Sequence, residues 1–224
     1  MTALSAIRQP EPASLREQVE RALSVAIIAG ELAPGTLVSV PTLAAQFQVS
    51  ATPVREAMLD LEKRGFVEPV RNKGFRVTHV KEEDLVEIVQ VRQMLEVPAM
   101  VAVTATFPHG RVPEFRALAD DIVDAVRRSD LPAYLAADLA FHLTLLRLTG
   151  NNRLVNLVAD MRSQTRMTGL ANMLGTDQLT ESANEHHTLL DLMAAGRTDD
   201  VQKLMTRHVG HVLGWWAGLP EGEQ

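Results

Sequence analysis

The segment from Val49 to Val77 constrains the fold of this chain most, because a helical pattern there passes directly into a pattern of short strands. Thr52 and the proline after it predict a helix start, with Thr52 as N-cap and the proline in the first helical position, where its missing N–H is no loss. The helix is expected to end at Gly65. Segments 66–70 and 75–77 then alternate around a basic, glycine-containing turn, which predicts a hairpin. A helix followed by such a hairpin is a winged helix-turn-helix, a structure that reads a DNA groove.

The helix in this segment has two unlike faces. Its inward face carries apolar residues at helical spacing, namely Val54, Ala57, Met58 and Leu61. Its outward face carries Ala51, Thr52, Arg55, Glu56 and Leu59. Because Arg55 lies near the N-terminus of the helix, it is the best candidate for contact with a base edge, commonly guanine. Lys63 and Arg64 are equally well explained as surface charges.

The net charge of −6 argues against nucleic acid only until its distribution is examined. Residues 1–78 hold 9 Lys and Arg against 8 Asp and Glu, whereas residues 79–224 hold 13 against 20. The acidity therefore belongs to the C-terminal part, and the basic residues of the N-terminal part cluster in the DNA-reading segment, as a phosphate backbone requires.

Composition limits the compartment and the kinds of site. The chain has no cysteine, so it has neither a disulfide framework nor a thiolate metal site. No signal peptide and no apolar run of membrane-spanning length stands out, so we expect a cytoplasmic protein that does not bind a membrane.

The patterns predict a mainly α chain in two domains. We expect a flexible arm over 1–13, a winged helix-turn-helix over 14–78, a hinge over 79–83, an all-helical domain over 84–217 and a tail over 218–224. Within the first domain, Ser14 and Glu17 form a capping box that starts a helix ending at Gly30. A short strand over 37–40 and a short helix over 42–47 follow.

Helical periodicity continues to the end of the second domain. The expected helices span 82–107, 113–128, 130–149, 153–172, 180–195 and 200–216, and Pro98 is expected to bend the first of them. Asp130 is expected to cap the third.

The N-terminal part resembles the GntR family of bacterial transcription regulators over residues 14–78. The resemblance is carried by AGELAPG, VSATPVREA and the GFV and NKGF segments of the hairpin. It implies DNA contacts from the helix by Thr52 and Arg55 and from the wing by Arg71, Lys73 and Gly74. The chain departs from the family at Ala51, where a basic residue is usual, and at Val40-Pro41-Thr42, where charged residues are usual, so some of the usual contacts are absent.

Histidines and one carboxylate dominate the chemistry of the helical domain. Asp138 and His142 stand four residues apart and project from one helix face. The later helices carry two further pairs of histidines, at 186 and 187 and at 208 and 211. Imidazole and carboxylate ligands together suit a divalent transition metal, zinc first and otherwise nickel, manganese or iron. The ordinary alternative is that these are surface or core histidines.

This domain is similar to the FCD effector domain of the FadR-like branch of the GntR family. DLAFHLTLLRLTGNNRL, NEHHTLLDLMAAG and VQKLMTRH carry the resemblance, in the order of the family. It implies a metal site made by Asp138, His142, His186 and His208. His187 and His211 are then bystanders, although His211 lies one turn from His208 and could replace it.

The resemblance also implies an effector site beside the metal. VRQMLE matches the first helix of the FCD domain, whose arginine, here Arg92, approaches the ligand. An ion pair with Glu96 is the alternative role for Arg92. Arg147, Arg162 and Arg166 are further candidates for the pocket.

Together these features predict a homodimeric transcription regulator, with a repressor as the first choice over an activator. It would bind a palindromic double-stranded DNA operator and a small carboxylate effector held against the metal. Two alternatives remain open: a regulator whose effector is the metal ion itself, and a metal-dependent hydrolase with Glu185 as its general base.

Overall fold

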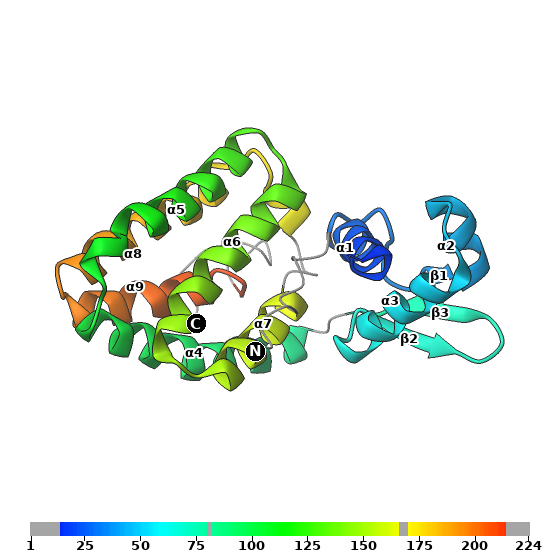
Figure 1. Ribbon diagram of the computed structural model, residues 1–224, viewed down its shortest axis with the longest axis horizontal. Helices are drawn as coiled ribbons and strands as arrows, with labels where there is room; N and C mark the ends of the chain where they lie inside the picture. The colour runs from blue at the N-terminus through cyan, green and yellow to red at the C-terminus, as the bar shows by residue number, and fades with distance from the viewer. Residues whose placement is uncertain (1–13, 80–81, 166–169, 214–224) are drawn as a thin grey trace, which may run out of the picture. The chain divides into compact units, whose positions relative to one another are not determined.

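The structure, a computed structural model, describes residues 14–79, 82–165 and 170–213, and it divides the chain into two compact units, residues 1–78 and 79–224 (Figure 1). The expected arm over 1–13 and tail over 218–224 lie outside the described residues, as do residues 80 and 81 of the expected hinge. The two units are described separately below.

The N-terminal unit is built from three helices and a small sheet. Its helices are α1 (Leu15–Ile28), α2 (Val40–Phe47) and α3 (Ala51–Lys63). The predicted capping box is present, since the Ser14 side chain accepts the Glu17 N–H and the Glu17 side chain accepts the Ser14 N–H. The four residues expected on the inner face of α3 are buried, and they pack this helix against α1 and α2.

The hairpin is present and gains a third strand. Strands β2 (Val67–Val70) and β3 (Gly74–Val77) pair antiparallel, and β1 (Leu37–Val38) pairs with the other edge of β3. The strand order is therefore β1-β3-β2, and the winged helix-turn-helix is confirmed.

Two predicted helix starts in this unit were wrong. The recognition helix α3 begins at Ala51 with Ser50 as N-cap, so Thr52 is not the cap and Pro53 is the third helical residue. Pro53 costs nothing there either, because the N–H groups of the first turn have no partner within the helix. Similarly, α2 begins at Val40 rather than Thr42, because the Ser39 hydroxyl accepts the Thr42 N–H and ends β1 earlier.

The C-terminal unit is all-helical over the residues that the structure describes. Its α-helices are α4 (Glu82–Ala105), α5 (Val112–Arg127), α6 (Leu131–Leu146), α7 (Asn152–Thr165), α8 (Asp177–Ala194) and α9 (Thr198–Gly210). Three short 3-10 turns, His109–Arg111, Arg147–Thr149 and Leu170–Met173, stand between them. The expected end of the last helix at Trp216 lies outside the described residues.

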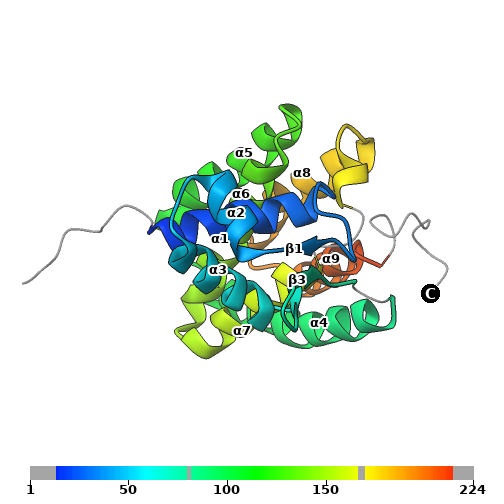
Figure 2. The same ribbon diagram turned by 90° about the vertical axis from the view of Figure 1, so that its right-hand side faces the viewer.

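The core of this unit lies between two sets of packed helices. Helix α5 packs on α6 and α8, while α4 packs on α9 and α7 (Figures 1 and 2). Tyr134, Phe115 and Phe141 are among the largest fully buried side chains. Asp130 caps α6 as predicted, with its carboxylate accepting the Ala133 N–H at 3.0 Å. Pro98 lies inside α4, which continues through it.

One helix tests the expectation that no segment could span a membrane. By length and composition alone, residues Leu131–Thr149 could cross a membrane. Half of this segment is buried inside the unit, however, and nine residues of α6 lie in its core, so this helix does not indicate a membrane protein.

Candidate functional site

The four predicted metal ligands lie together in the helical unit. Helix α6 supplies Asp138 and His142, α8 supplies His186 and α9 supplies His208. Each offers one ligand atom, and these four atoms all lie within 4.8 Å of one another. The His142 side chain is fully buried and that of His208 is 9% exposed. Spacing along α6 and packing of three helices therefore bring one carboxylate and three imidazoles to one point.

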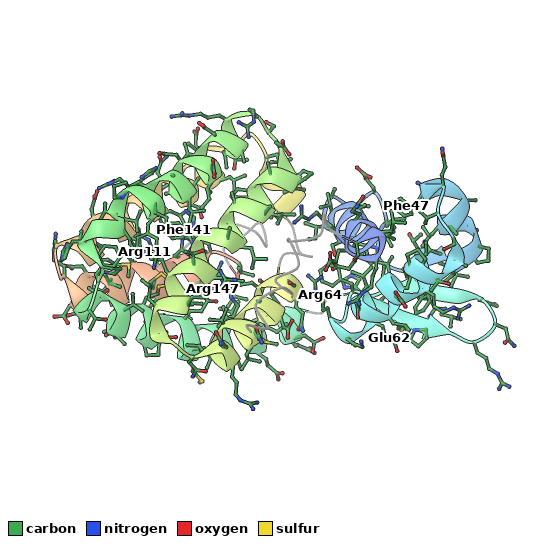
Figure 3. The ribbon with its side chains drawn as sticks, in the orientation of Figure 1. Phe47, Glu62, Arg64, Arg111, Phe141 and Arg147 are labelled. Carbon is green, nitrogen blue, oxygen red and sulfur yellow. The ribbon has the colours of Figure 1, made fainter. Side chains whose placement is uncertain are left out.

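The three imidazoles meet through the same ring atom. His142 Nε2 lies 3.1 Å from His186 Nε2 and 3.3 Å from His208 Nε2. Asp138 Oδ1 lies 3.6 Å from His142 Nε2 and 3.4 Å from His186 Nε2. The ring of Phe141, a residue of α6 that Figure 3 labels, is buried and meets the His142 and His186 rings edge to face.

Hydrogen bonds on the other ring nitrogens decide what these atoms offer. His186 Nδ1 lies 2.9 Å from the Ala183 carbonyl, and His208 Nδ1 lies 2.8 Å from Glu185 Oε2. A carbonyl and a carboxylate only accept, so each Nδ1 carries the proton. In the neutral ring Nε2 is then a lone pair. Two lone pairs and the Asp138 carboxylate therefore face one another, an arrangement that a cation would relieve.

His142 and His208 are held in the neutral form that binds metals. Burial lowers the pKa of His208 to about 4, although the hydrogen bond to Glu185 opposes this change. Burial, followed by the charge of Arg162, holds the pKa of His142 well below its ordinary value. These two imidazoles need not lose a proton before they bind a metal at neutral pH.

The spacing of the four atoms suits a small transition-metal ion. A metal–nitrogen distance of about 2.1 Å places neighbouring ligand atoms about 3.0 Å apart in an octahedron and about 3.4 Å apart in a tetrahedron. The two Nε2–Nε2 distances and the two distances from Asp138 Oδ1 to Nε2 atoms lie between 3.1 and 3.6 Å. His142 Nδ1 is buried and has no hydrogen-bond partner within the described residues, so only Nε2 connects this ring to the cluster. The residues present fit the ion that the sequence predicts.

Arg92 lies in a buried set of charges rather than at the imidazoles. Its Nε donates to Glu96 Oε1 at 2.8 Å, so the ion pair considered as its alternative role is present. Glu96 also accepts from Arg162 Nε at 3.0 Å, and Arg162 Nη1 donates to Asp138 Oδ2 at 3.2 Å. All four side chains are at most 7% exposed. Asp138 thus faces the imidazoles with one oxygen and the guanidinium of Arg162 with the other.

From the sequence, Glu96 was named only as an ion-pair partner of Arg92, and Arg162 only as one of three candidates for the pocket. Glu96 stands four residues after Arg92, a spacing that was visible in the sequence. Arg162 was only one of three possible arginines, because its contact with Asp138 depends on the packing of α7 against α6. Of the other two, Arg147 is exposed and Arg166 lies outside the described residues.

Of the two histidine pairs noted in the sequence, His187 and His211 are not part of the four-residue cluster. His187 Nε2 lies 3.2 Å from Asp120 on α5. His211 Nε2 lies 2.9 Å from Glu185 Oε2, which also takes His208 Nδ1. His211 therefore approaches His208 from the side away from Asp138, and in this geometry it does not replace His208.

Glu185 is buried and contacts three side chains at the C-terminal end of α9, of which His211 is the C-cap. Besides His208 and His211, Arg207 donates to its Oε1 from Nε at 3.0 Å and from Nη2 at 2.6 Å. Burial raises the pKa of this carboxyl, but the hydrogen bonds from His208 and His211 lower it more. The pKa of Glu185 therefore lies well below its ordinary value. An ionised carboxylate with these partners is poorly placed to act as a general base.

The predicted DNA contacts lie on the exposed surface of the N-terminal unit. Thr52 and Arg55 are exposed on α3, and Arg71 and Lys73 are exposed in the turn of the wing. Within the described residues, Arg55, Arg71 and Lys73 have no acidic partner. Other basic side chains of this segment do have one: Lys63 pairs with Asp60, Arg64 with Glu20 and Arg76 with Glu68. The cations expected to contact DNA are thus available to phosphate.

Gly74 has a structural reason of its own. Its φ is +121°, and a Cβ built there would lie 2.2 Å from the carbonyl oxygen of Val38. The close pairing of β1 with β3 therefore requires glycine at this position, whether or not its backbone contacts DNA.

Comparison with known proteins identifies both units. Residues 15–77 match the family model "Bacterial regulatory proteins, gntR family", and residues 87–211 match the FCD domain. The chain is 30% identical over 200 residues to the "Probable D-xylose utilization operon transcriptional repressor" of Paenarthrobacter nicotinovorans, covering 89% of this chain and 88% of that protein. It is 31% identical over 211 residues to the transcriptional regulator LutR of Bacillus subtilis (strain 168), covering 82% and 92%. Among solved structures, Escherichia coli McbR/YncC has a TM-score of 0.77 at 22% identity, covering 92% of this chain and 99% of that one.

Proposed function

Because this chain belongs to the GntR family of bacterial regulatory proteins and carries an FCD domain, it is a DNA-binding transcription regulator and not an enzyme, and we propose that it is a metal-containing repressor controlled by a small organic acid. One observation carries the metal: three imidazole Nε2 atoms and a carboxylate oxygen from three helices meet at one buried point. We assign Asp138, His142, His186 and His208 as the ligands and zinc as the first choice of ion.

The DNA-binding surface is proposed from the availability of its cations. Thr52 and Arg55 of α3 would enter the major groove, while Arg71 and Lys73 of the wing would contact phosphate. The backbone of Gly74, at the start of β3 in the same wing, would also contact the DNA. The three basic side chains form no ion pair with any residue that the structure describes, and this supports the assignment, because no such pair has to break when DNA binds.

The effector is proposed to bind beside the ion and the buried guanidiniums. When bound, the metal would supply positive charge and a coordination position for a carboxylate. Arg92 would hold the acid from the side of α4, and Arg162, which touches both Asp138 and Glu96, is a second candidate. Because Glu96 already occupies both guanidiniums, an incoming carboxylate would compete with it.

We propose that the regulator is a cytoplasmic homodimer that binds a palindromic operator. A two-fold operator requires two DNA-binding units. Within the described residues of the helical unit, the large apolar side chains that remain exposed are Val91, Met94 and Leu157. They lie on α4 and α7, two helices that pack together, and burial of this surface in a partner would stabilise a dimer.

A matched pair of variants tests the metal and its role. We expect the wild type to bind one zinc ion per chain and His142→Ala to bind none while still folding and binding DNA. His187→Ala is the control, because this neighbouring histidine pairs with Asp120 outside the cluster. Metal analysis, thermal melting and DNA binding to the promoter region beside the gene would be measured, with and without a panel of organic acids.

The same measurements separate the competing mechanisms. If DNA affinity follows added zinc alone, with no effect of any acid, the ion itself is the effector. A metal-free His142→Ala protein that still releases DNA normally when an acid is added would sink the proposed mechanism.

A further inference from the structure

Glu185 is a buried carboxylate to which the proposed function gives no role. It lies on α8 directly before His186, and its side-chain partners among the described residues lie in the last turn of α9 and at the C-cap of that helix. Oε2 faces both His208 Nδ1 and His211 Nε2, and Oε1 accepts from Arg207. One residue of α8 thus engages three side chains at the C-terminal end of α9.

The contact with His208 fixes which nitrogen that ring presents to the cluster. A carboxylate can only accept, so the 2.8 Å contact keeps the proton on Nδ1 and leaves a lone pair on Nε2. That Nε2 lies 3.3 Å from His142 Nε2, at the point where the other donor atoms meet. Without the carboxylate, the neutral ring could carry its proton on Nε2 instead, and this tautomer cannot bind a metal through Nε2.

The carboxylate is itself held in place. Its side chain is 6% exposed, whereas that of Arg207, which grips the second oxygen, is 55% exposed. His211 fixes the oxygen that His208 uses, from a fully buried position. Glu185 therefore has little freedom to turn away from His208, and its hydrogen bond restrains the orientation of the His208 ring.

We propose that Glu185 is a positioning residue for the metal centre, which holds His208 in the tautomer and orientation that offer Nε2 to the ion. The inference rests on the proposed metal site. Hydrogen bonds of this kind to metal-binding histidines change affinity by about 10- to 100-fold when they are removed.

The first test is a carboxylate-to-amide exchange with a matched control. Glu185→Gln should retain one zinc ion per chain but bind it about 10- to 100-fold more weakly in chelator competition. Asp191→Asn makes the same exchange on the same helix, at an exposed residue paired with Arg116, and should bind zinc as the wild type does. The absorption spectrum of bound Co²⁺ should change in Glu185→Gln and not in the control, since it reports ligand geometry.

A double-mutant cycle shows whether Glu185 acts through His208. In a His208→Ala background, where zinc binds too weakly to copurify and its affinity is measured by titration with excess zinc, Glu185→Gln should cause much less further loss of affinity than in the wild type, because the ring that it positions is gone. An equal loss in both backgrounds would overturn the proposal.

A measurement on the wild type keeps the proposal testable if Glu185→Gln does not fold. Long-range nitrogen–proton NMR spectra of the metal-free protein should show His208 protonated on Nδ1, and protonation on Nε2 would refute the inference. A wild type that binds no zinc would refute the proposed metal centre itself. A wild type that binds zinc no more tightly than Glu185→Gln would refute only the role of Glu185.

Discussion

Arg55 and Lys73 have the same charge, but their positions indicate different roles in DNA binding. Arg55 lies on the exposed face of α3 near its start, where side chains of a recognition helix reach base edges. Lys73 lies in the turn between β2 and β3, where a cation meets the phosphate backbone. Neither has an acidic partner within the described residues, so loss of either should be felt only when DNA is present.

We predict that Arg55→Ala relaxes sequence preference and costs about 1–3 kcal/mol on the specific site. Lys73→Ala should weaken binding to specific and to nonspecific DNA alike. It should also lower the salt dependence of binding, because about one fewer counterion is released from the DNA. Titrations of both DNA types at several salt concentrations measure this. An unchanged ratio of specific to nonspecific affinity in Arg55→Ala would show that this residue does not read bases.

Gly74 allows the cost of a backbone conformation to be separated from the cost of a collision. A positive φ alone is expected to cost about 1–2 kcal/mol when alanine replaces glycine. We predict that Gly74→Ala destabilises the N-terminal unit by more than this, because the Cβ of the alanine would collide with the Val38 carbonyl. Gly35→Ala is the control, since Gly35 also has a positive φ, +84°, with nothing within 4 Å of its Cβ. Thermal or urea unfolding would compare the two. Equal losses would mean that β1 and β3 separate at little cost.

At the scale of elements, the sequence was most informative where local chemistry decides the structure. Ser14 with Glu17 and Asp130 each act as the caps that their spacing predicted. The predicted start of α3 was wrong because Thr52 and Ser50 are both good N-cap residues. Which of them caps the helix depends on the backbone conformation of the turn between α2 and α3. Gln48 takes a φ of +56° in that turn, which no residue preference predicts.

The candidate site was predictable only in part, for a related reason. Asp138 and His142 share a face by spacing alone, but the positions of His186 and His208 beside them were implied by a resemblance and not by any pattern in the chain. The roles of Arg162 and Glu185 depend on which faces of α7, α8 and α9 meet in the core. Those contacts join residues far apart in the sequence, so no local period reveals them.

The apolar surface of α4 and α7 leads to a prediction about assembly. Met94 is 72% exposed, and Val91, one helical turn before it, is 39% exposed. We predict that Met94→Glu weakens the dimer without unfolding the subunit, because a charge would be buried at the interface of the dimer but lies in water in the monomer. Analytical ultracentrifugation and thermal melting would separate the two effects. Gln202→Glu, which adds the same charge at an exposed residue of α9, serves as the control for charge alone, and dimerisation equal to the wild type in Met94→Glu would place the interface elsewhere.

For the whole molecule, the buried charges link the candidate effector site to the start of the helical unit. Arg92 and Glu96 lie in α4, the first helix after the division between the two units near residue 79. Glu96 accepts from Arg162, which in turn donates to Asp138 of the proposed metal site. Two guanidiniums are balanced by two carboxylates, so an added metal ion and an added acid each disturb a neutral set of charges. An acid that displaces Glu96 would move a side chain of α4, the first helix that follows the DNA-binding unit in the chain.

Exchanging either member of the Arg92–Glu96 pair should therefore change the response to acids in opposite directions. Glu96→Gln leaves two buried guanidiniums with one carboxylate fewer, which should cost about 3–5 kcal/mol of stability in the absence of acid. An organic acid that binds the wild type should then raise the melting temperature of Glu96→Gln by more than it raises that of the wild type. Arg92→Ala should respond less than the wild type while keeping its metal, because Arg162 still balances Glu96. Melting curves with and without acid, with metal content measured on the same samples, decide the matter, and a smaller response in Glu96→Gln than in the wild type would exclude competition between Glu96 and the effector.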